Sequence, residues 1–170
     1  MKSKTQVVVI GGGLIGCSIL YHLTKLGWSD VVLLERDELT SGSTWHAAAG
    51  IHGLHDSTNI SRIQHYTMNL YKELEKETGL STGLKQNGSL TVATTKGRLD
   101  ELKRQVNTAQ LFNIDAREVS NDEISEIYPV INTEDIIGGV FIPKDGQADP
   151  VGVTNVLAKG AKQNLSLIHN

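Results

Sequence analysis

Six consecutive residues near the N-terminus have the types and spacing of a dinucleotide-binding turn. Gly11-Gly12-Gly13-Leu14-Ile15-Gly16 fits the pattern G-x-G-x-x-G. In this pattern the first glycine forms a tight turn, the second lets the backbone approach a pyrophosphate, and the third lets a helix pack closely on a strand. We expect the N–H groups near Leu14 and Ile15 to hold the phosphates, because the helix dipole also favours negative charge there.

An acidic residue follows this turn at the sequence separation expected of a ribose-binding acid. Glu35 stands 19 residues after Gly16, close to the spacing of an acid that accepts ribose hydroxyls. Its charge would repel a 2′-phosphate, so NADP is disfavoured. These residues alone do not decide whether the dinucleotide is FAD or NAD.

The local sequence places the glycine turn between a strand and a helix. Residues 7–10 are β-branched, which is typical of a strand buried on both faces of a parallel sheet. Apolar residues recur at helical spacing over 14–26, and Gly27 ends this helix. Residues 31–35 predict a second buried strand that ends in the acid. Together these segments predict one βαβ unit with parallel strands.

The rest of the chain predicts a less regular alternation of helices and strands. A long connection over 37–58 is rich in Ser, Thr, Gly and His, and Ser43 or Thr44 is expected to cap a short helix in it. The final predicted strand has no partner and no following element, so we expect a chain truncated at its C-terminus. Helices are expected at about 59–78, 99–112, 120–128 and 150–163, and strands at 89–94, 136–142 and 165–169.

Composition excludes several classes of function. The 170 residues carry 16 Lys and Arg against 19 Asp and Glu, a net charge of -3 without the basic stripe that nucleic-acid binding needs. No apolar run approaches the roughly 18–20 residues of a membrane span, and no signal peptide is visible. Cys17 cannot form an internal disulfide and is expected to be a small buried hydrophobe. His52 and His55 lack the cluster that would complete a metal site. We expect a cytoplasmic protein, or one of the mitochondrial matrix if eukaryotic, without membrane, metal or nucleic-acid partners.

Several stretches resemble a known family of flavoproteins. The sequence at 7–18, with the glycine turn, and the segments Asp-Val-Val-Leu-Leu-Glu-Arg at 30–36 and Leu-Thr-Ser-Gly-Ser-Thr-Trp-His-Ala-Ala at 39–48 are similar to the N-terminal FAD domain of the dimethylglycine and sarcosine dehydrogenases. That family belongs to the D-amino-acid-oxidase-like superfamily. The similarity continues through 73–79, 86–90 and Asp-Gly-Gln-Ala-Asp-Pro at 145–150.

The resemblance implies an α/β fold: a Rossmann-like FAD/NAD(P)-binding fold of the glutathione-reductase type, with part of an inserted α+β substrate subdomain. Residues 1–58 are then the FAD-binding βαβ unit and flavin-side loop. Residues 59–150 supply helices and strands of the FAD domain and the inserted subdomain, and residues 151–170 a return helix and strand.

The resemblance also implies roles for individual residues. The glycine turn would hold the FAD pyrophosphate, Glu35 and Arg36 would flank the adenosine ribose, and Gly42 to Gly50 would pass close to the flavin. Trp45 is expected to pack beside the isoalloxazine or in the core. The FAD-binding residues expected on this basis are Gly11, Gly13, Leu14, Ile15, Gly16, Glu35, Arg36, Gly42, Ser43, Thr44, Trp45, Ala47, Ala48 and Gly50.

His46 matches the histidine that is bonded to the 8α-methyl of the flavin in characterised members. A neutral imidazole nitrogen can attack an electrophilic flavin methylene, and the bond would hold the ring and tune its potential. The chain departs from the family at Ala49, where glycine is usual, and Gly50 follows. The alternative is that His46 packs or hydrogen-bonds locally beside a dissociable FAD.

By this resemblance the chain is the N-terminal part of an enzyme that oxidises the CH–NH bond of a small N-methylated amino acid, by hydride transfer to flavin N5. Electrons would pass to an electron-transfer flavoprotein or to oxygen, and tetrahydrofolate would bind in a C-terminal region beyond residue 170. The catalytic residues are not identified, and we expect no turnover from these residues alone. The alternatives are a non-catalytic dinucleotide-binding module and another flavin oxidase of the superfamily with dissociable FAD.

Overall fold

The computed structural model describes residues 4–55, 57–164 and 167–169, which form two compact units. Unit 1 contains residues 1–49, 68–84 and 148–170, and unit 2 contains residues 50–67 and 85–147. Unit 2 therefore interrupts unit 1 at two places in the sequence. Among the described residues, no helix combines the length and apolar character needed to cross a bilayer.

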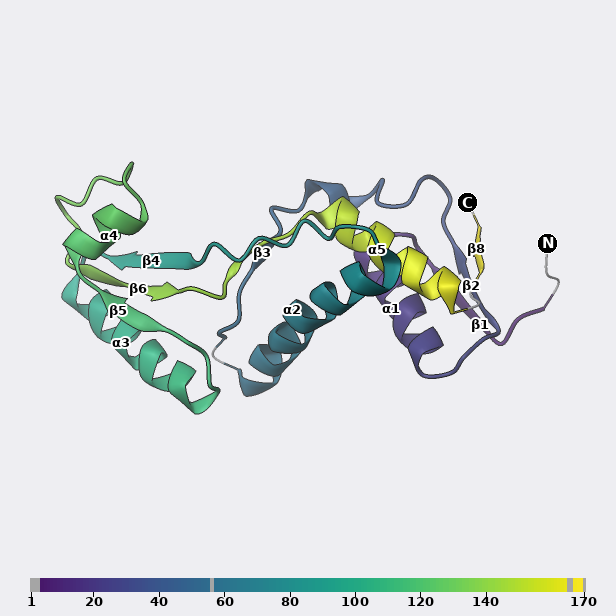
Figure 1. The fold of residues 1–170 in the computed structure, drawn as a ribbon, viewed down its shortest axis with the longest axis horizontal. Coiled ribbons are helices and arrows are strands. Elements are labelled where there is room, and N and C mark those ends of the chain that lie inside the picture. The colour runs from purple at the N-terminus through teal and green to yellow at the C-terminus, as the bar shows by residue number, and fades with distance from the viewer. Residues whose placement is uncertain (1–3, 56, 165–166, 170) are drawn as a thin grey trace. The chain divides into compact units, whose positions relative to one another are not determined.

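Unit 1 is built on a parallel three-stranded sheet with the order β1-β2-β8 (Figure 1). Strand β1 (Val7–Ile10) and strand β2 (Val31–Leu34) pair from Val7 opposite Val31 to Ile10 opposite Leu34, with helix α1 (Leu14–Lys25) between them in sequence. This confirms the predicted βαβ unit. Strand β8 (Leu167–His169) pairs in parallel with the other edge of β2. The expectation that the last strand has no partner in the chain was therefore wrong, because helix α5 (Pro150–Gln163) returns the chain to that edge.

One face of β1 is covered and the other is open. Val9 is buried, and the position of a Cβ on Gly16 of α1 lies 3.6 Å from a Val9 methyl group, so α1 packs on this face. Val8 and Ile10, which point the other way, are 47% and 85% exposed. The prediction of a strand buried on both faces was wrong for β1, since a continuous β-branched run does not say how many layers cover the sheet.

Helices α1 and α5 pack against each other in unit 1. Leu20 of α1 and Leu157 of α5 are among the largest fully buried side chains. Helix α5 begins as expected, with the Asp149 carboxylate accepting from the N–H of Val151 and proline at the first position. Helix α1 ends before Gly27, whose φ of 91° favours glycine.

Unit 2 contains an antiparallel sheet with the order β4-β6-β5. Strand β6 (Gly138–Ile142) lies between β4 (Ser89–Ala93) and β5 (Arg117–Val119). Leu102 of helix α3 (Lys96–Leu111) packs with Val140 of β6 in one buried cluster.

The expected capping box is present at helix α4 (Asn121–Ile127) of unit 2, where Ser120 and Glu123 each accept from the other's backbone N–H. Helix α3 starts earlier than expected because Thr95 caps it. Strand β5 was not predicted, since its three residues are too short for a periodic pattern.

Two further short strands join distant parts of unit 2. Strand β3 (Gly50–Ile51) pairs antiparallel with β7 (Gly146–Gln147), and Lys85 forms a bridge to Gln147 on the other side. Neither two-residue strand was predicted. Helix α2 (Thr58–Thr78) follows β3, agrees with the predicted helix, and ends at Gly79, whose φ is 69°.

Candidate functional site

The glycine turn between β1 and α1 leaves no room for a side chain at Gly12, Gly13 or Gly16. A Cβ on Gly16 would lie 1.9 Å from the carbonyl oxygen of Gly11, far inside any allowed contact. Gly11 itself has a φ of 108°, a conformation that favours glycine. On Gly12 a Cβ would lie 2.5 Å from Leu39, and on Gly13 2.9 Å from the Thr44 hydroxyl oxygen. The helix therefore approaches the strand as closely as the motif predicts.

Glu35 follows β2 and is tied to the same turn. Its Oε2 accepts the N–H of Gly12 at 2.6 Å, and its Oε1 accepts the N–H groups of Arg36 and Asp37 at 2.7 and 3.1 Å. The N–H of Gly12, followed by that of Asp37, holds the pKa of the Glu35 carboxyl below its usual range. The carboxylate is thus ionised beside the turn, and its contact with a ribose stays a prediction.

A short 3-10 helix, η1 (Ser43–His46), lies at the start of α1. The Thr44 hydroxyl accepts the N–H of Leu14 at 3.0 Å. The prediction that Ser43 or Thr44 caps η1 was wrong: Gly42 is the capping residue, and the Thr44 hydroxyl instead satisfies an unpaired N–H of α1. The helix also ends at His46 and does not continue through the alanines.

These segments line one hollow of about 560 Å³ in unit 1. Trp45, His46, Ala47 and Ala48 do not line it, and Gly50 belongs to unit 2. Ser41 lines it but was not predicted, since nothing distinguishes this serine from its loop neighbours in sequence. The predicted residues that do line it are Gly11, Gly13, Leu14, Ile15, Gly16, Glu35, Arg36, Gly42, Ser43 and Thr44.

The His46 imidazole is exposed, and its Nδ1 lies 3.2 Å from the Gly42 carbonyl oxygen. A carbonyl only accepts, so this bond requires Nδ1–H and leaves the lone pair of the neutral ring on Nε2. The Trp45 ring lies against it, with 4.3 Å between ring centroids. Trp45 is 59% exposed, so its alternative placement in the core was wrong.

Ala49, where the family usually has glycine, has a φ of 56°. This is the left-handed region, which costs a residue with a Cβ about 1–2 kcal/mol. Ala49 therefore holds a backbone conformation that suits glycine better than alanine.

Cys17 follows the turn inside α1 and is fully buried, as predicted. Burial raises the pKa of its thiol to about 11, and the nearby charge of Glu35 adds to this effect. A thiol that stays protonated is a poor nucleophile, so Cys17 is a packing residue.

The hollow fits the diphosphate of a dinucleotide. Glycine backbone at Gly11, Gly13 and Gly16 lines it, and the N–H groups of Ile15 and Gly16, in the first turn of α1, have no acceptor within the helix. The ionised Glu35 carboxylate also borders the hollow. Within the described residues, no group of three or more His, Cys, Asp or Glu side chains is placed to hold a metal ion.

Comparison with known proteins agrees with this geometry. The chain is 43% identical over 95% of its length to human mitochondrial sarcosine dehydrogenase and 41% identical over 95% to rat mitochondrial dimethylglycine dehydrogenase. It is 36% identical over 96% to the mouse mitochondrial pyruvate dehydrogenase phosphatase regulatory subunit. It covers 18% of the first of these relatives and 19% of the other two.

A solved structure shows the same fold. L-proline dehydrogenase from P. horikoshii superposes with a TM-score of 0.90 at 28% identity, over 99% of this chain and 44% of that one. The family model described as DAO, FAD dependent oxidoreductase, matches residues 6–170. The glycine turn, the parallel βαβ unit and these similarities agree, and the chain belongs to the DAO family of FAD-dependent oxidoreductases.

Proposed function

We propose that this chain forms the FAD-binding N-terminal part of an enzyme that oxidises the CH–NH bond of a small N-methylated amino acid of the dimethylglycine or sarcosine type. The observation that carries the proposal is the single hollow lined by the glycine turn, Glu35 and the Ser43–Thr44 segment. The identity of 41–43% to sarcosine and dimethylglycine dehydrogenases supports the substrate class.

The chain's own residues bind and orient the cofactor in this proposal. The N–H groups of the first turn of α1 other than that of Leu14 receive the pyrophosphate, and Glu35 with Arg36 borders the adenosine ribose. Thr44 holds η1 against the start of α1 through its bond from Leu14. When bound, FAD supplies the hydride acceptor, N5 of its ring.

We further propose that His46 carries the flavin covalently at its 8α position. The bond from Nδ1 to the Gly42 carbonyl supports this, because it orients the ring and leaves Nε2 as the nucleophile. A C8α–H bond would break as the Nε2–C8α bond forms, the protons would pass to solvent, and the enzyme's electron acceptor would take up the two electrons released. The exposed Trp45 ring beside His46 is available to pack on the isoalloxazine.

The proposal extends to the rest of the reaction. Electrons leave to an electron-transfer flavoprotein or to oxygen, and tetrahydrofolate accepts the one-carbon unit in a region that this chain does not contain. The compartment is the cytoplasm, or the mitochondrial matrix in a eukaryote, as the names of the relatives suggest. The chain spans about a fifth of the relatives' length, so we expect no turnover from residues 1–170 alone.

A non-catalytic FAD-binding module is the second candidate. It is favoured by the relative whose name describes a regulatory subunit, at 36% identity. The two candidates make the same prediction for the glycine turn, and they differ in whether an amine reduces the bound flavin.

The test is flavin retention followed by flavin reduction. The natural protein that contains this chain is purified and denatured in acid, and yellow flavin that stays with the protein in the wild type but not in His46→Ala supports the covalent link. Bleaching of the flavin by sarcosine or dimethylglycine without oxygen supports the enzyme. Flavin that no N-methylated amino acid bleaches favours the module, and a protein that binds no flavin refutes both.

A further inference from the structure

The Thr44 hydroxyl joins two parts of unit 1 that have separate tasks in the proposed function. It accepts the N–H of Leu14, at the start of α1, at 3.0 Å. Helix α1 supplies the N–H groups of the phosphate site, and Thr44 lies two residues before His46 on η1. This hydrogen bond is therefore a direct link between the phosphate site and the histidine.

The loop that carries Thr44 follows a fixed path beside the glycine turn. A Cβ on Gly13 would lie 2.9 Å from the Thr44 hydroxyl oxygen, so this oxygen fills the space that a side chain would need. A second bond holds the loop, because the N–H of Thr40 donates to the Gly12 carbonyl at 3.1 Å. Thr40 is buried and has a φ of 73°, a conformation that persists only where the surroundings hold it.

Two bonds within η1 carry the position of Thr44 on to the imidazole. The N–H of Ala47 donates to the Thr44 carbonyl at 3.2 Å and closes the turn. Nδ1 of His46 donates to the Gly42 carbonyl at 3.2 Å and sets the orientation of the ring. Helix α5 also contacts η1, so we expect loss of the Thr44 hydroxyl to displace η1 without unfolding it.

A covalently bound FAD must meet both ends of this link. In the proposed function its pyrophosphate lies at the start of α1, and its 8α carbon must reach Nε2 of His46. The distance between the glycine turn and the imidazole therefore decides whether these two atoms come within reacting distance. A misplacement of about 1 Å can slow a reaction about hundredfold.

We propose that Thr44 is a positioning residue for covalent flavin attachment. Its hydroxyl holds η1 on α1 at the separation that brings Nε2 of His46 to the 8α carbon. The Nε2–C8α bond forms as a C8α–H bond breaks, the protons pass to solvent, and an electron acceptor takes up the two electrons. Thr44 acts through His46 and takes no part in these bond changes. The inference rests on the proposed function, in which His46 carries the flavin.

The experiment follows covalent attachment in the natural protein that contains this chain. The protein is produced without flavin, and FAD is added in air so that oxygen takes up the two electrons. Flavin that stays with the protein in acid is then measured against time at several FAD concentrations. The rate at saturating FAD reports the geometry of the attack, and the FAD concentration that gives half of this rate reports binding.

Thr44→Val removes the hydroxyl at nearly constant volume. It is expected to lower the saturating rate about three- to tenfold, the effect of losing one hydrogen bond. Thr44→Ser keeps the hydroxyl and should retain most of the wild-type rate. Thr91→Val makes the same change at an exposed position of β4 in unit 2 and should leave the rate unchanged. If Thr44→Val does not fold, Thr44→Ala takes its place with the same expected result, because its smaller side chain fits the same space.

Hydrogen exchange at the Leu14 amide of the flavin-free protein measures the bond itself. Exchange is expected to be faster in Thr44→Val than in the wild type and Thr44→Ser, because the amide then loses its acceptor. A wild-type saturating rate in Thr44→Val overturns the proposal. A change confined to the FAD concentration at half rate also overturns it, because that result assigns Thr44 to binding alone.

Failure of this inference and failure of the proposed function give different results. Acid-stable flavin that forms equally fast in Thr44→Val overturns the positioning role alone. Flavin that acid releases from the wild type overturns this role and the covalent link, whereas bleaching of that flavin by sarcosine still supports the enzyme. Slow attachment in Thr44→Val, with flavin that no N-methylated amino acid bleaches, supports the positioning role and favours the module.

Discussion

Replacing Gly16 by alanine tests the glycine turn directly. The new Cβ would lie 1.9 Å from the Gly11 carbonyl oxygen, so strand and helix must separate by about 1.1 Å to restore even 3.0 Å. Overpacking of this kind costs about 1–3 kcal/mol of folding free energy. The shift also moves the first-turn N–H groups, and loss of one hydrogen bond to a charged phosphate, about 1.5–3 kcal/mol, lowers FAD affinity at least about tenfold.

Urea unfolding measures the first effect, and flavin fluorescence titration measures the second in a His46→Ala background, where the flavin stays dissociable. Gly97→Ala is the matched control, because a Cβ there meets nothing within 4 Å and should leave stability unchanged or raise it by up to about 1 kcal/mol. If Gly16→Ala does not fold, Gly13→Ala replaces it, since its Cβ contacts only the Thr44 hydroxyl at 2.9 Å, which can rotate away. A Gly16→Ala protein with the wild-type unfolding midpoint and FAD affinity would refute the reasoning.

Three further substitutions or treatments test other parts of unit 1. Ala49→Gly removes the strain of a φ of 56°, but glycine also gives the unfolded chain more conformational entropy, which offsets part of this gain. The free energy of unfolding measured in urea should therefore rise by about 0.5–1 kcal/mol. A loss of stability would contradict this. The hydroxyl and N–H of Thr82 hold the pKa of Glu75 below its ordinary 4.5, so Glu75 contributes stability that is present above that pH and lost as pH falls through the lowered pKa. The midpoint of urea unfolding should therefore fall less between pH 6 and pH 3.5 in Glu75→Gln than in the wild type. An equal fall in both proteins argues against the hydrogen bonds from Thr82 to Glu75. The Cys17 thiol, with its pKa raised to about 11, should react with iodoacetamide at pH 8.5 far more slowly in the native chain than in urea, and equal rates would show that it is accessible.

Much of unit 1, and the start of helix α4 in unit 2, could be predicted because the signals are local. The glycine spacing, the β-branched strands and the caps at Ser120 and Asp149 each depend on residues within a few positions of one another. Seven of the expected cofactor residues line one hollow for the same reason, since a βαβ unit brings its turn and the end of its second strand together whatever the rest of the chain does. The other three, Gly42, Ser43 and Thr44, reach the hollow from the loop beyond this unit.

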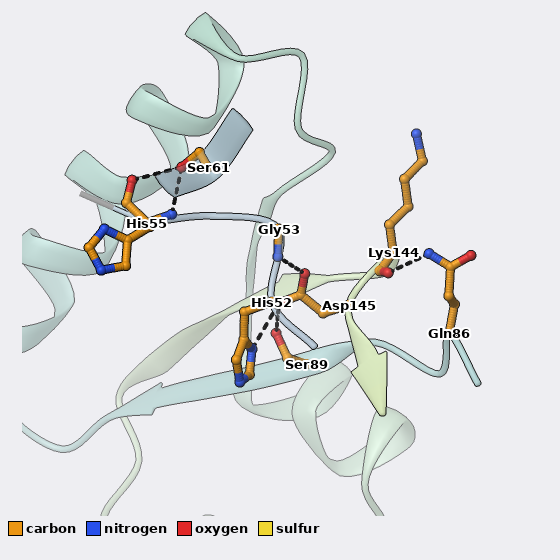
Figure 2. A network of polar contacts seen from close by, with 8 residues as sticks. All are labelled: His52, Gly53, His55, Ser61, Gln86, Ser89, Lys144 and Asp145. Carbon is orange, nitrogen blue, oxygen red and sulfur yellow. Dashed lines mark hydrogen bonds and ion pairs between the residues drawn. The ribbon is translucent and has the colours of Figure 1, made fainter. Parts of the chain in front are cut away.

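The tertiary structure decided the contacts between residues that are far apart in the sequence. Local patterns do not indicate that Thr44 would accept from Leu14, that β8 would pair with β2, or that Val8 would remain exposed. His52 and the buried Asp145 are 93 residues apart and meet only because two-residue strands pair around Gly146 (Figure 2). Strands that short have no periodicity to detect, and their pairing depends on how the sheet and loops of unit 2 pack. The sequence by itself therefore determined the nucleotide-binding turn, whereas packing alone determined which histidine received a buried carboxylate partner.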